Sequence, residues 1–175
     1  MTYPIFEKAR EYAHRCHNET NHSYDGMPYT FHLYMVDDEI MRFQHLIPPS
    51  KLDVVRAGGA CHDVIEDARQ TYNDVKQATN EEVAELAYAL TNEKGKNRKE
   101  RANHKYYDGI LDTDYACFLK LCDRIANITH SKKKKSSMLD AYRKENTYFC
   151  LCLHRQQGLR LYEEMFVYID KLLLD

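Results

Sequence analysis

Apolar residues recur every three to four positions along most of the chain, which is the spacing of one face of a helix. Ile5, Ala9, Tyr12 and Cys16 form the first such stripe. Six glycines and four prolines in 175 residues leave little material for the turns of an all-β protein. The pattern therefore predicts an all-α protein, folded as a single bundle of about seven to nine helices.

The bounds of the expected helices follow from the ends of the apolar stripes and from capping residues between them. The predicted ranges are 5–18, 29–43, 51–67, 71–78, 81–90, 103–111, 114–129, 136–153 and 159–173. Lys132–Lys135, a run of four lysines, is interpreted as a solvated loop between two helices. Because no linker or internal repeat interrupts the pattern, we expect one domain over residues 1–175.

Composition limits the class of protein. The formal net charge of −2 gives no overall attraction to nucleic acid or to an anionic membrane. No apolar run approaches the ~20 residues of a membrane span, and the N-terminus lacks the basic-then-apolar form of a signal peptide. The six cysteines are interpreted as reduced thiols, since five of them lie in apolar helical stretches. We therefore expect a cytoplasmic protein with no nucleic-acid or membrane partner.

One stretch carries an unusual density of ionisable groups. His62, Asp63, Glu66 and Asp67 lie within two helical turns, directly after the mostly apolar run Val54–Cys61. Glu66 follows His62 by four positions and Asp67 follows Asp63 by four, so each pair shares a helix face. Burying these groups without partners would be costly, and a bound metal would supply the partner. The alternative for this stretch alone is a partly exposed helix end with ordinary acidic residues.

Two further residues favour the metal interpretation. His32 follows the turn at Tyr24–Pro28 on an otherwise apolar helix, although a lone histidine there is more often a satisfied core residue. Asp123 lies in an apolar helical run with Asn127 four positions later, an arrangement that packing alone rarely requires. Two imidazoles and two carboxylates from three helices suit Mn²⁺, Fe²⁺ or Zn²⁺ and leave room for water and a substrate oxygen. This set is His32, His62, Asp63 and Asp123.

The order H…HD…D is the signature of the HD phosphohydrolase superfamily. Its extended form here is Tyr29-x-x-His32, His62-Asp63-x-x-Glu66-Asp67 and Leu119-Lys120-Leu121-x-Asp123-Arg124-x-x-Asn127. This form resembles the hydrolase domain of RelA/SpoT-type enzymes, and even more the stand-alone small alarmone hydrolases, including those of the animal Mesh type. The resemblance runs from about Ala9 to about His154, which is most of the chain.

The resemblance implies an all-α HD fold with one Mn²⁺ on His32, His62, Asp63 and Asp123, for which Zn²⁺ or Fe²⁺ are alternatives. It implies hydrolysis of the 3′-pyrophosphate of ppGpp or pppGpp, which yields GDP or GTP and pyrophosphate. Glu66 and Asp67 match the acidic pair that positions and deprotonates the attacking water in such enzymes. The expected partner is a small nucleotide, and the resemblance leaves a homodimer open.

The expected substrate contacts lie in three segments. A phosphate-neutralising loop is expected at the basic residues Lys94, Lys96, Arg98, Lys99 and Arg101, for which a plain solvated loop is the alternative. The segment before Gly26 departs from the family, because it has no Arg or Lys to pack on a guanine base. We expect looser contact with the base, through stacking on His22 or Tyr24 and an amide from Asn127. The set is completed by two residues of a later helix, Arg143 and Thr147.

Two other classes of function remain open. One is an HD phosphohydrolase with another substrate, such as ppApp, a nucleoside monophosphate or NADPH, which the missing basic residues favour. The pair Glu66-Asp67 favours the alarmone instead, since many other HD nucleotidases are not expected to have it. The other class is a regulatory module that binds a nucleotide without turnover. The complete set of four candidate ligands argues against that class.

Overall fold

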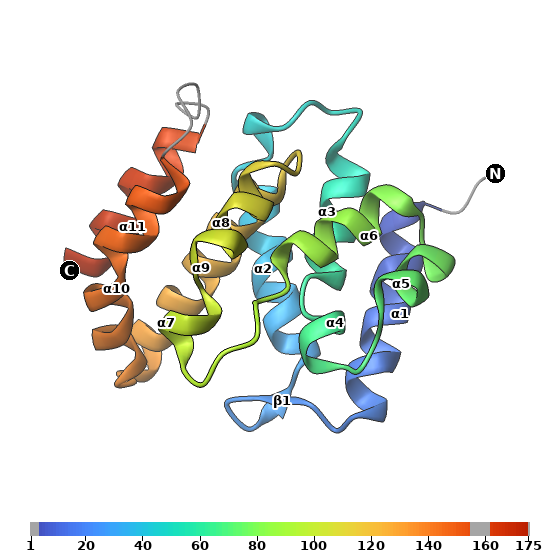
Figure 1. Cartoon of the computed structure of the whole chain (residues 1–175), viewed down its shortest axis with the longest axis horizontal. Coiled ribbons are helices and arrows are strands. Elements are labelled where there is room, and N and C mark those ends of the chain that lie inside the picture. The colour runs from blue at the N-terminus through green and yellow to red at the C-terminus, as the bar shows by residue number, and fades with distance from the viewer. Residues whose placement is uncertain (1–3, 155–161, 175) are drawn as a thin grey trace.

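The apolar stripes form helices in a computed structural model of the chain, which describes residues 4–154 and 162–174 (Figure 1). Eleven α-helices occur in this described part, and two of them, α4 and α7, are single turns of four residues. The remaining nine agree with the predicted number, so the prediction of an all-α bundle is confirmed. Within the same residues, no helix combines the length and the apolar character that crossing a membrane requires.

The elements of the N-terminal half are α1 (Ile5–Glu19), β1 (Ser23–Tyr24), β2 (Met27–Pro28), α2 (Thr30–Arg42), a 3-10 turn (Gln44–Leu46), α3 (Leu52–Cys61), α4 (Val64–Asp67) and α5 (Tyr72–Ala78). The later elements are α6 (Glu81–Leu90), α7 (Arg98–Arg101), α8 (His104–Leu111), α9 (Ala116–Lys134), α10 (Met138–Leu153) and α11 (Glu163–Leu174). The last helix was predicted to begin at residue 159, and residues 159–161 lie outside the described part.

Two apolar clusters form the core. One cluster joins α1 to α3, α4 and α6, and the other surrounds α9 with residues of α2, α8, α10 and α11. Figure 1 shows α2 between these two groups of helices. Because α2, α3 and α9 all contact one another, they meet where the two clusters adjoin. This junction is where the predicted metal ligands lie.

Two glycines allow α3 to lie close to its neighbours. A Cβ atom on Gly58 would lie 2.6 Å from Leu86 Cδ1 and 3.0 Å from Leu119 Cδ1. A Cβ atom on Gly59 would lie 2.5 Å from Ile40 Cδ1. Since larger residues would hold the helices apart, the Gly58-Gly59 pair helps to bring the C-terminal end of α3 toward α2 and α9.

We expect Gly58→Ala to lower the free energy of unfolding. Overpacking costs ~1–3 kcal/mol, and the better helix propensity of alanine offsets only ~0.5–1 kcal/mol of that. Gly109→Ala in α8 is the matched control, because no atom lies within 4 Å of a Cβ placed there. The free energy of unfolding of the control should change only by the better helix propensity of alanine. Urea unfolding measures the free energy of unfolding of both variants. Equal changes would show that a methyl group at position 58 fits without overpacking.

Two helix boundaries differ from the prediction. The predicted helix 51–67 is interrupted at His62 and Asp63, where Asp63 has φ −110° and ψ 1°, outside the helical region. The predicted loop at the four lysines is also wrong, since α9 continues to Lys134 and ends at Lys135 in a left-handed conformation with φ 51°. Lysines in the last turn of a helix are stabilised by the negative end of its dipole, which explains this extension.

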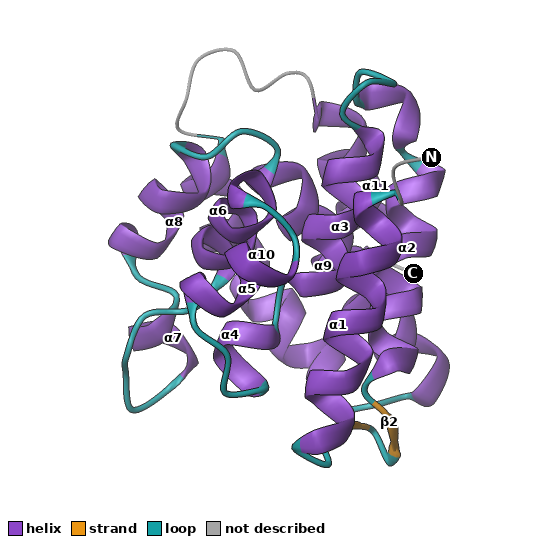
Figure 2. Cartoon of the chain, turned by 90° about the vertical axis from the view of Figure 1, so that its right-hand side faces the viewer, coloured by secondary structure: helices purple, strands orange, loops and turns teal. Residues whose placement is uncertain are grey.

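A small hairpin follows α1 and precedes α2, drawn in orange in Figure 2. Ser23 pairs with Pro28, and the turn residues Asp25 and Gly26 have φ values of 50° and 79°. Two consecutive positive φ values are typical of the tight turns that join antiparallel strands. Asp25 Oδ2 lies 2.9 Å from His130 Nε2 on α9, so the hairpin is fixed to the helix that carries Asp123.

Candidate active site

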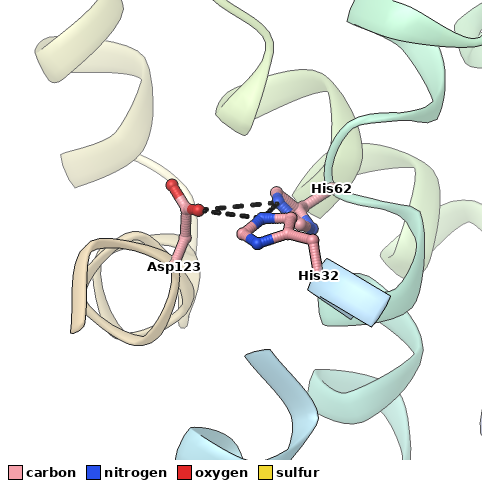
Figure 3. Close-up of side chains that lie close together, drawn as sticks. All are labelled: His32, His62 and Asp123. Atoms are coloured by element: carbon pink, nitrogen blue, oxygen red, sulfur yellow. Dashed lines mark hydrogen bonds and ion pairs between the residues drawn. The ribbon is translucent and has the colours of Figure 1, made fainter. Parts of the chain in front are cut away.

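Three helices and one helix break bring the predicted metal ligands together. His32 lies in the first turn of α2 and Asp123 lies in the middle of α9. His62 follows the last residue of α3, and Asp63 precedes the first residue of α4. Figure 3 shows the side chains of His32, His62 and Asp123 pointing toward one another. Both histidines are almost fully buried, with exposed fractions of 1% and 3%.

The donor atoms are spaced as the ligands of one cation would be. The Nε2 atoms of His32 and His62 are 3.3 Å apart, and Asp123 Oδ1 lies 3.2 Å and 3.8 Å from them. Asp63 Oδ2 lies 2.8 Å from His62 Nε2 and 3.8 Å from His32 Nε2. Neighbouring ligands held ~2.0–2.3 Å from a metal are roughly 2.8–3.8 Å apart in tetrahedral or octahedral geometry. The donor atoms of His32, His62 and Asp123 all lie within 4.8 Å of one another. Asp63 lies beside this group through its contacts with the two imidazoles.

The two imidazoles are oriented with Nε2 toward the cluster. His62 Nδ1 lies 2.8 Å from the carbonyl oxygen of Gly59, so Nδ1 carries a proton and donates it. Such a second hydrogen bond is the usual device that orients a metal-binding histidine. His32 is held by the ring of Tyr24, which stacks on it at 4.7 Å between centroids with 13° between the planes. The helix break after α3 therefore aims His62 at the same point as His32.

The charges around the cluster favour a cation. Burial lowers the pKa of His62, but the carboxylates of Asp63 and Asp123 outweigh it and raise this pKa to about 9. Burial raises the pKa of Asp123, but Lys120 and the two histidines hold it well below its usual range. The carboxylates therefore stay ionised and favour a positive charge beside them, which a metal ion would supply. The donor set fits a divalent metal.

Tyr29 and two histidines form a layer behind Asp63. The buried Tyr29 hydroxyl donates a hydrogen bond to Asp63 Oδ2. The ring of His22 stacks on Tyr29 at 3.9 Å between centroids, and His22 Nδ1 lies 3.0 Å from His17 Nδ1. His22, the expected base contact, thus packs against Tyr29 and is not among the residues that line the neighbouring cavity.

A cavity of about 520 Å³ opens beside the cluster, and His32, Asp63 and Asp123 form part of its wall. Basic and aromatic side chains make up much of the remaining wall. The basic residues are Arg98, Lys99, Arg101, Lys120, Arg124 and Lys144, and the tyrosines are Tyr24, Tyr29, Tyr106, Tyr107, Tyr142 and Tyr148. Arginine and lysine with flanking aromatic rings suit a ligand that has both phosphates and a planar base.

The two acidic residues of α4 have different surroundings. Glu66 lines the cavity and accepts hydrogen bonds from the Asn92 backbone N–H, at 3.1 Å, and from Asn92 Nδ2, at 2.9 Å. Asp67 is more exposed and is not among the lining residues. Partial burial of its carboxyl group and the negative charges of Asp63 and Glu66 raise the pKa of Asp67 to about 7. Glu66 is therefore the better placed of the two for contact with a ligand.

Two of the expected base contacts lie in the cavity wall. Tyr24 donates a hydrogen bond to Asn127 Oδ1 at 2.7 Å, and Asn127 Nδ2 donates to the backbone oxygen of Asp123 at 3.0 Å. Both residues therefore line the cavity, and Asn127 is bonded directly to Asp123, one of the expected metal ligands. The predicted stacking of Asn127 on the Asp123 face of the helix is confirmed by this contact.

The remaining expected substrate contacts divide into two groups. Arg98 and Lys99 line the cavity, whereas Lys96 does not, and its backbone N–H donates to Glu100 Oε2 at 2.8 Å. Arg143 Nε donates to the backbone oxygen of Leu173 at 3.0 Å, which directs it toward α11. Thr147 is exposed outside the cavity wall. Of the expected basic segment, Arg98, Lys99 and Arg101 thus line the cavity, whereas Lys94 and Lys96 do not.

Several residues of the wall were missed at the level of sequence. Lys120 carried a usable signal, because it interrupts an apolar stretch three positions before Asp123 and so shares its helix face. Arg124 and Lys144 carried no comparable signal. They reach the cavity from α9 and α10, which only tertiary packing brings together.

No family model matches the chain. Among solved structures, a metazoan ortholog of SpoT, which hydrolyses ppGpp and plays a role in starvation responses, has a similar structure with a TM-score of 0.66 and 18% sequence identity. The match covers 98% of this chain and 96% of that chain. This match confirms the predicted resemblance to SpoT-type enzymes at the level of the all-helical fold. The chain thus shares the all-helical fold of this SpoT ortholog over nearly the full length of both chains.

Proposed function

We propose that the chain is a metal-dependent phosphohydrolase that removes the 3′-pyrophosphate of ppGpp or pppGpp. The products would be GDP or GTP and pyrophosphate. One observation supports this most strongly: the donor atoms of His32, His62, Asp63 and Asp123 converge at the wall of a basic cavity. That arrangement occurs in the fold of a protein that hydrolyses ppGpp, so its substrate is the first to consider for this chain.

The proposed ligands of the metal are these same four residues. Two imidazoles and two carboxylates suit Mn²⁺, with Fe²⁺ or Zn²⁺ as alternatives, better than Mg²⁺ or Ca²⁺, which prefer oxygen ligands alone. When bound, such a cation lowers the pKa of water and neutralises charge on a phosphate. A phosphate bound in the cavity would lie beside three of these residues, since His32, Asp63 and Asp123 form part of the cavity wall.

Glu66 is the proposed general base. Its carboxylate faces the cavity, and the two hydrogen-bond donors of Asn92 fix its position. A carboxylate held in this way can accept the proton of a water molecule that attacks the phosphorus atom. Asp67 lies one position further and is proposed to help position the water, as in the family that the sequence resembles.

Arg98 and Lys99 are the proposed phosphate contacts of the basic loop. We expect the double variant Arg98→Ala/Lys99→Ala to raise KM by about ten-fold, which corresponds to ~1.4 kcal/mol. The effect should shrink at high salt, because ions screen exposed charges. Initial rates at low and high salt measure this. Lys105→Ala is the control, since Lys105 is 79% exposed and pairs with Glu93 outside the cavity wall. A salt-independent change would argue against a phosphate contact.

The nucleobase has fewer proposed contacts than the phosphates. The segment before Gly26 has no Arg or Lys, and Tyr24 is already stacked on His32 and bonded to Asn127. These contacts favour looser recognition of the base and make an adenine nucleotide such as ppApp, or NADPH, the second candidate substrate. We therefore propose weaker discrimination between guanine and adenine than in typical relatives.

The proposed function is tested by incubating the protein with Mn²⁺ and ppGpp, pppGpp, ppApp or NADPH, and identifying the products by chromatography. We expect GDP and pyrophosphate from ppGpp, no reaction with EDTA, and recovery when Mn²⁺ is restored. Failure to release pyrophosphate from ppGpp and pppGpp would contradict the proposal, and release of pyrophosphate from ppApp alone or of phosphate from NADPH alone would favour the second candidate. A strong guanine preference that survives mutation of both His22 and Tyr24 would contradict its statement about the base.

A further inference from the structure

Lys120 occupies an unusual position for a lysine. It lies on α9 between Leu119 and Leu121, whose exposed fractions are 1% and 0%. The Lys120 side chain is only 18% exposed, and what remains accessible lines the cavity. Because lysine is almost never buried to this degree without a partner, its contacts indicate what it does.

The contacts of Lys120 connect it to the proposed metal centre. Its Nζ donates to Asp123 Oδ2 at 2.8 Å, while the other oxygen of Asp123, Oδ1, lies 3.2 Å from His32 Nε2. The ammonium also lies 5.8 Å from the ring centroid of Tyr106. An ammonium has three N–H groups, and Asp123 and Tyr106 engage at most two of them. At least one N–H is therefore available to a ligand in the cavity.

Three other cations of the cavity wall, all arginines, form ion pairs with glutamates. Arg98 and Arg124 both contact Glu145, at 2.9 Å and 3.3 Å, and Arg101 Nη1 lies 3.7 Å from Glu66 Oε1. Lys120 is paired as well, but its partner is a proposed metal ligand. A phosphate oxygen that reached a metal beside Asp123 Oδ1 would therefore lie near the ammonium on the other oxygen of the same carboxylate.

The charge of the proposed metal centre gives an adjacent ammonium a role. Asp63 and Asp123 carry two negative charges, which a divalent cation only balances. The centre alone would then offer no net positive charge to a pyrophosphate group, and the overall charge of the protein is −2. Lys120 supplies the missing positive charge at the place where the phosphate would bind.

We propose that Lys120 is a catalytic residue whose ammonium binds a non-bridging oxygen of the phosphoryl group that reacts; this inference rests on the proposed function. In that reaction the oxygen of water forms a bond to the phosphorus next to the ribose 3′ oxygen, and Glu66 takes one proton. The bond from phosphorus to the 3′ oxygen breaks, its electron pair stays on that oxygen, and a proton from solvent completes the hydroxyl. Lys120 stabilises the charge on the phosphoryl oxygens as this exchange proceeds.

Two substitutions distinguish binding of the phosphoryl oxygen by Lys120 from a role in which Lys120 only holds Asp123 in place for the metal. Lys120→Met keeps the length of the side chain and removes its charge, and Lys120→Arg keeps the charge. We expect Lys120→Met to bind Mn²⁺ at least as tightly as the wild type, because a neighbouring positive charge is lost. It should bind inorganic pyrophosphate, the probe, at least ten-fold more weakly in the presence of Mn²⁺. Lys120→Arg should recover most of this affinity, and kcat for ppGpp should follow the same order.

Calorimetric titration with Mn²⁺, and then with pyrophosphate, gives both affinities. The control is Lys8→Met on the exposed side of α1, which should bind both like the wild type. Wild-type pyrophosphate affinity in Lys120→Met would overturn the proposal. Loss of Mn²⁺ binding in that variant would also overturn it, because Lys120 would then only support Asp123. A wild-type protein that hydrolyses no alarmone would contradict the proposed function. The pyrophosphate affinities of the wild type and of Lys120→Met could still be compared, because binding of pyrophosphate needs no turnover.

A second measurement applies if Lys120→Met does not fold. Acetylation of lysines in the wild-type protein, followed by mass spectrometry, reports how accessible each side chain is. Pyrophosphate with Mn²⁺ should protect Lys120 several-fold and leave Lys8 unchanged. Equal labelling of Lys120 with and without pyrophosphate would overturn the proposal.

Discussion

Asp123→Ala should abolish both Mn²⁺ binding and hydrolysis, with a loss of turnover of ~10³-fold or more, the scale of several kcal/mol of lost metal catalysis. The variant loses one of only two negatively charged donors in the cluster. It also leaves the Lys120 ammonium, which pairs with Asp123 at 2.8 Å, without its partner beside two imidazoles. That positive charge would repel a cation in addition to the loss of a ligand. Titration with Mn²⁺ and an assay for released pyrophosphate measure the two effects.

The matched control is Asp38→Ala, at an exposed position of the same α2 helix that carries His32. It removes the same charge from the protein and should change neither property. An Asp123→Ala variant that bound Mn²⁺ with wild-type affinity would remove Asp123 from the metal centre and leave the four-ligand arrangement without support.

Glu66→Gln should keep the metal and slow hydrolysis by ~10²-fold or more, the usual scale for loss of a general base. The amide has almost the shape of the carboxylate but cannot accept the proton of water. The carboxylate of Glu66 contacts Asn92 and Arg101, neither of which is a proposed ligand. We therefore expect kcat to fall with little change in KM and in Mn²⁺ affinity. Steady-state rates and a Mn²⁺ titration measure this.

Glu81→Gln, at an exposed position in the first turn of α6, is the control and should leave kcat unchanged. A Glu66→Gln variant that no longer binds Mn²⁺ would show that Glu66 is a ligand and not a base. Unchanged kcat with retained metal would transfer the role of base to another group, for which Asp67 is the next candidate.

The helices that carry the site were predictable because each combines an apolar stripe with a polar residue that interrupts it. His32 and Asp123 were identified in this way, as ionisable groups on faces that are otherwise buried. The interruption between α3 and α4 was not predictable. The run Cys61-His62-Asp63-Val64 contains neither glycine nor proline, so the local sequence favours a continuous helix. The break arises where the two histidines and Asp63 converge, which is a tertiary arrangement.

The cavity wall was less predictable than the metal cluster. His22 was expected at the base because it lies in the turn before His32, but its ring stacks on Tyr29 instead. Such aromatic packing depends on the position of α1, which spacing along the chain does not define. In the same way, Lys144 on α10 reaches the cavity, whereas Arg143, its neighbour, contacts the backbone of α11. Which of two adjacent basic residues faces a cavity follows from helix packing.

The central claim is that one divalent metal ion binds between α2, α3, α4 and α9. Anomalous X-ray diffraction from crystals grown with Mn²⁺, recorded at the manganese absorption edge, tests it most directly. The expected result is a single strong peak ~2.0–2.3 Å from His32 Nε2, His62 Nε2, Asp63 Oδ2 and Asp123 Oδ1. A map with no peak between these atoms, or with its manganese bound elsewhere, would contradict the claim.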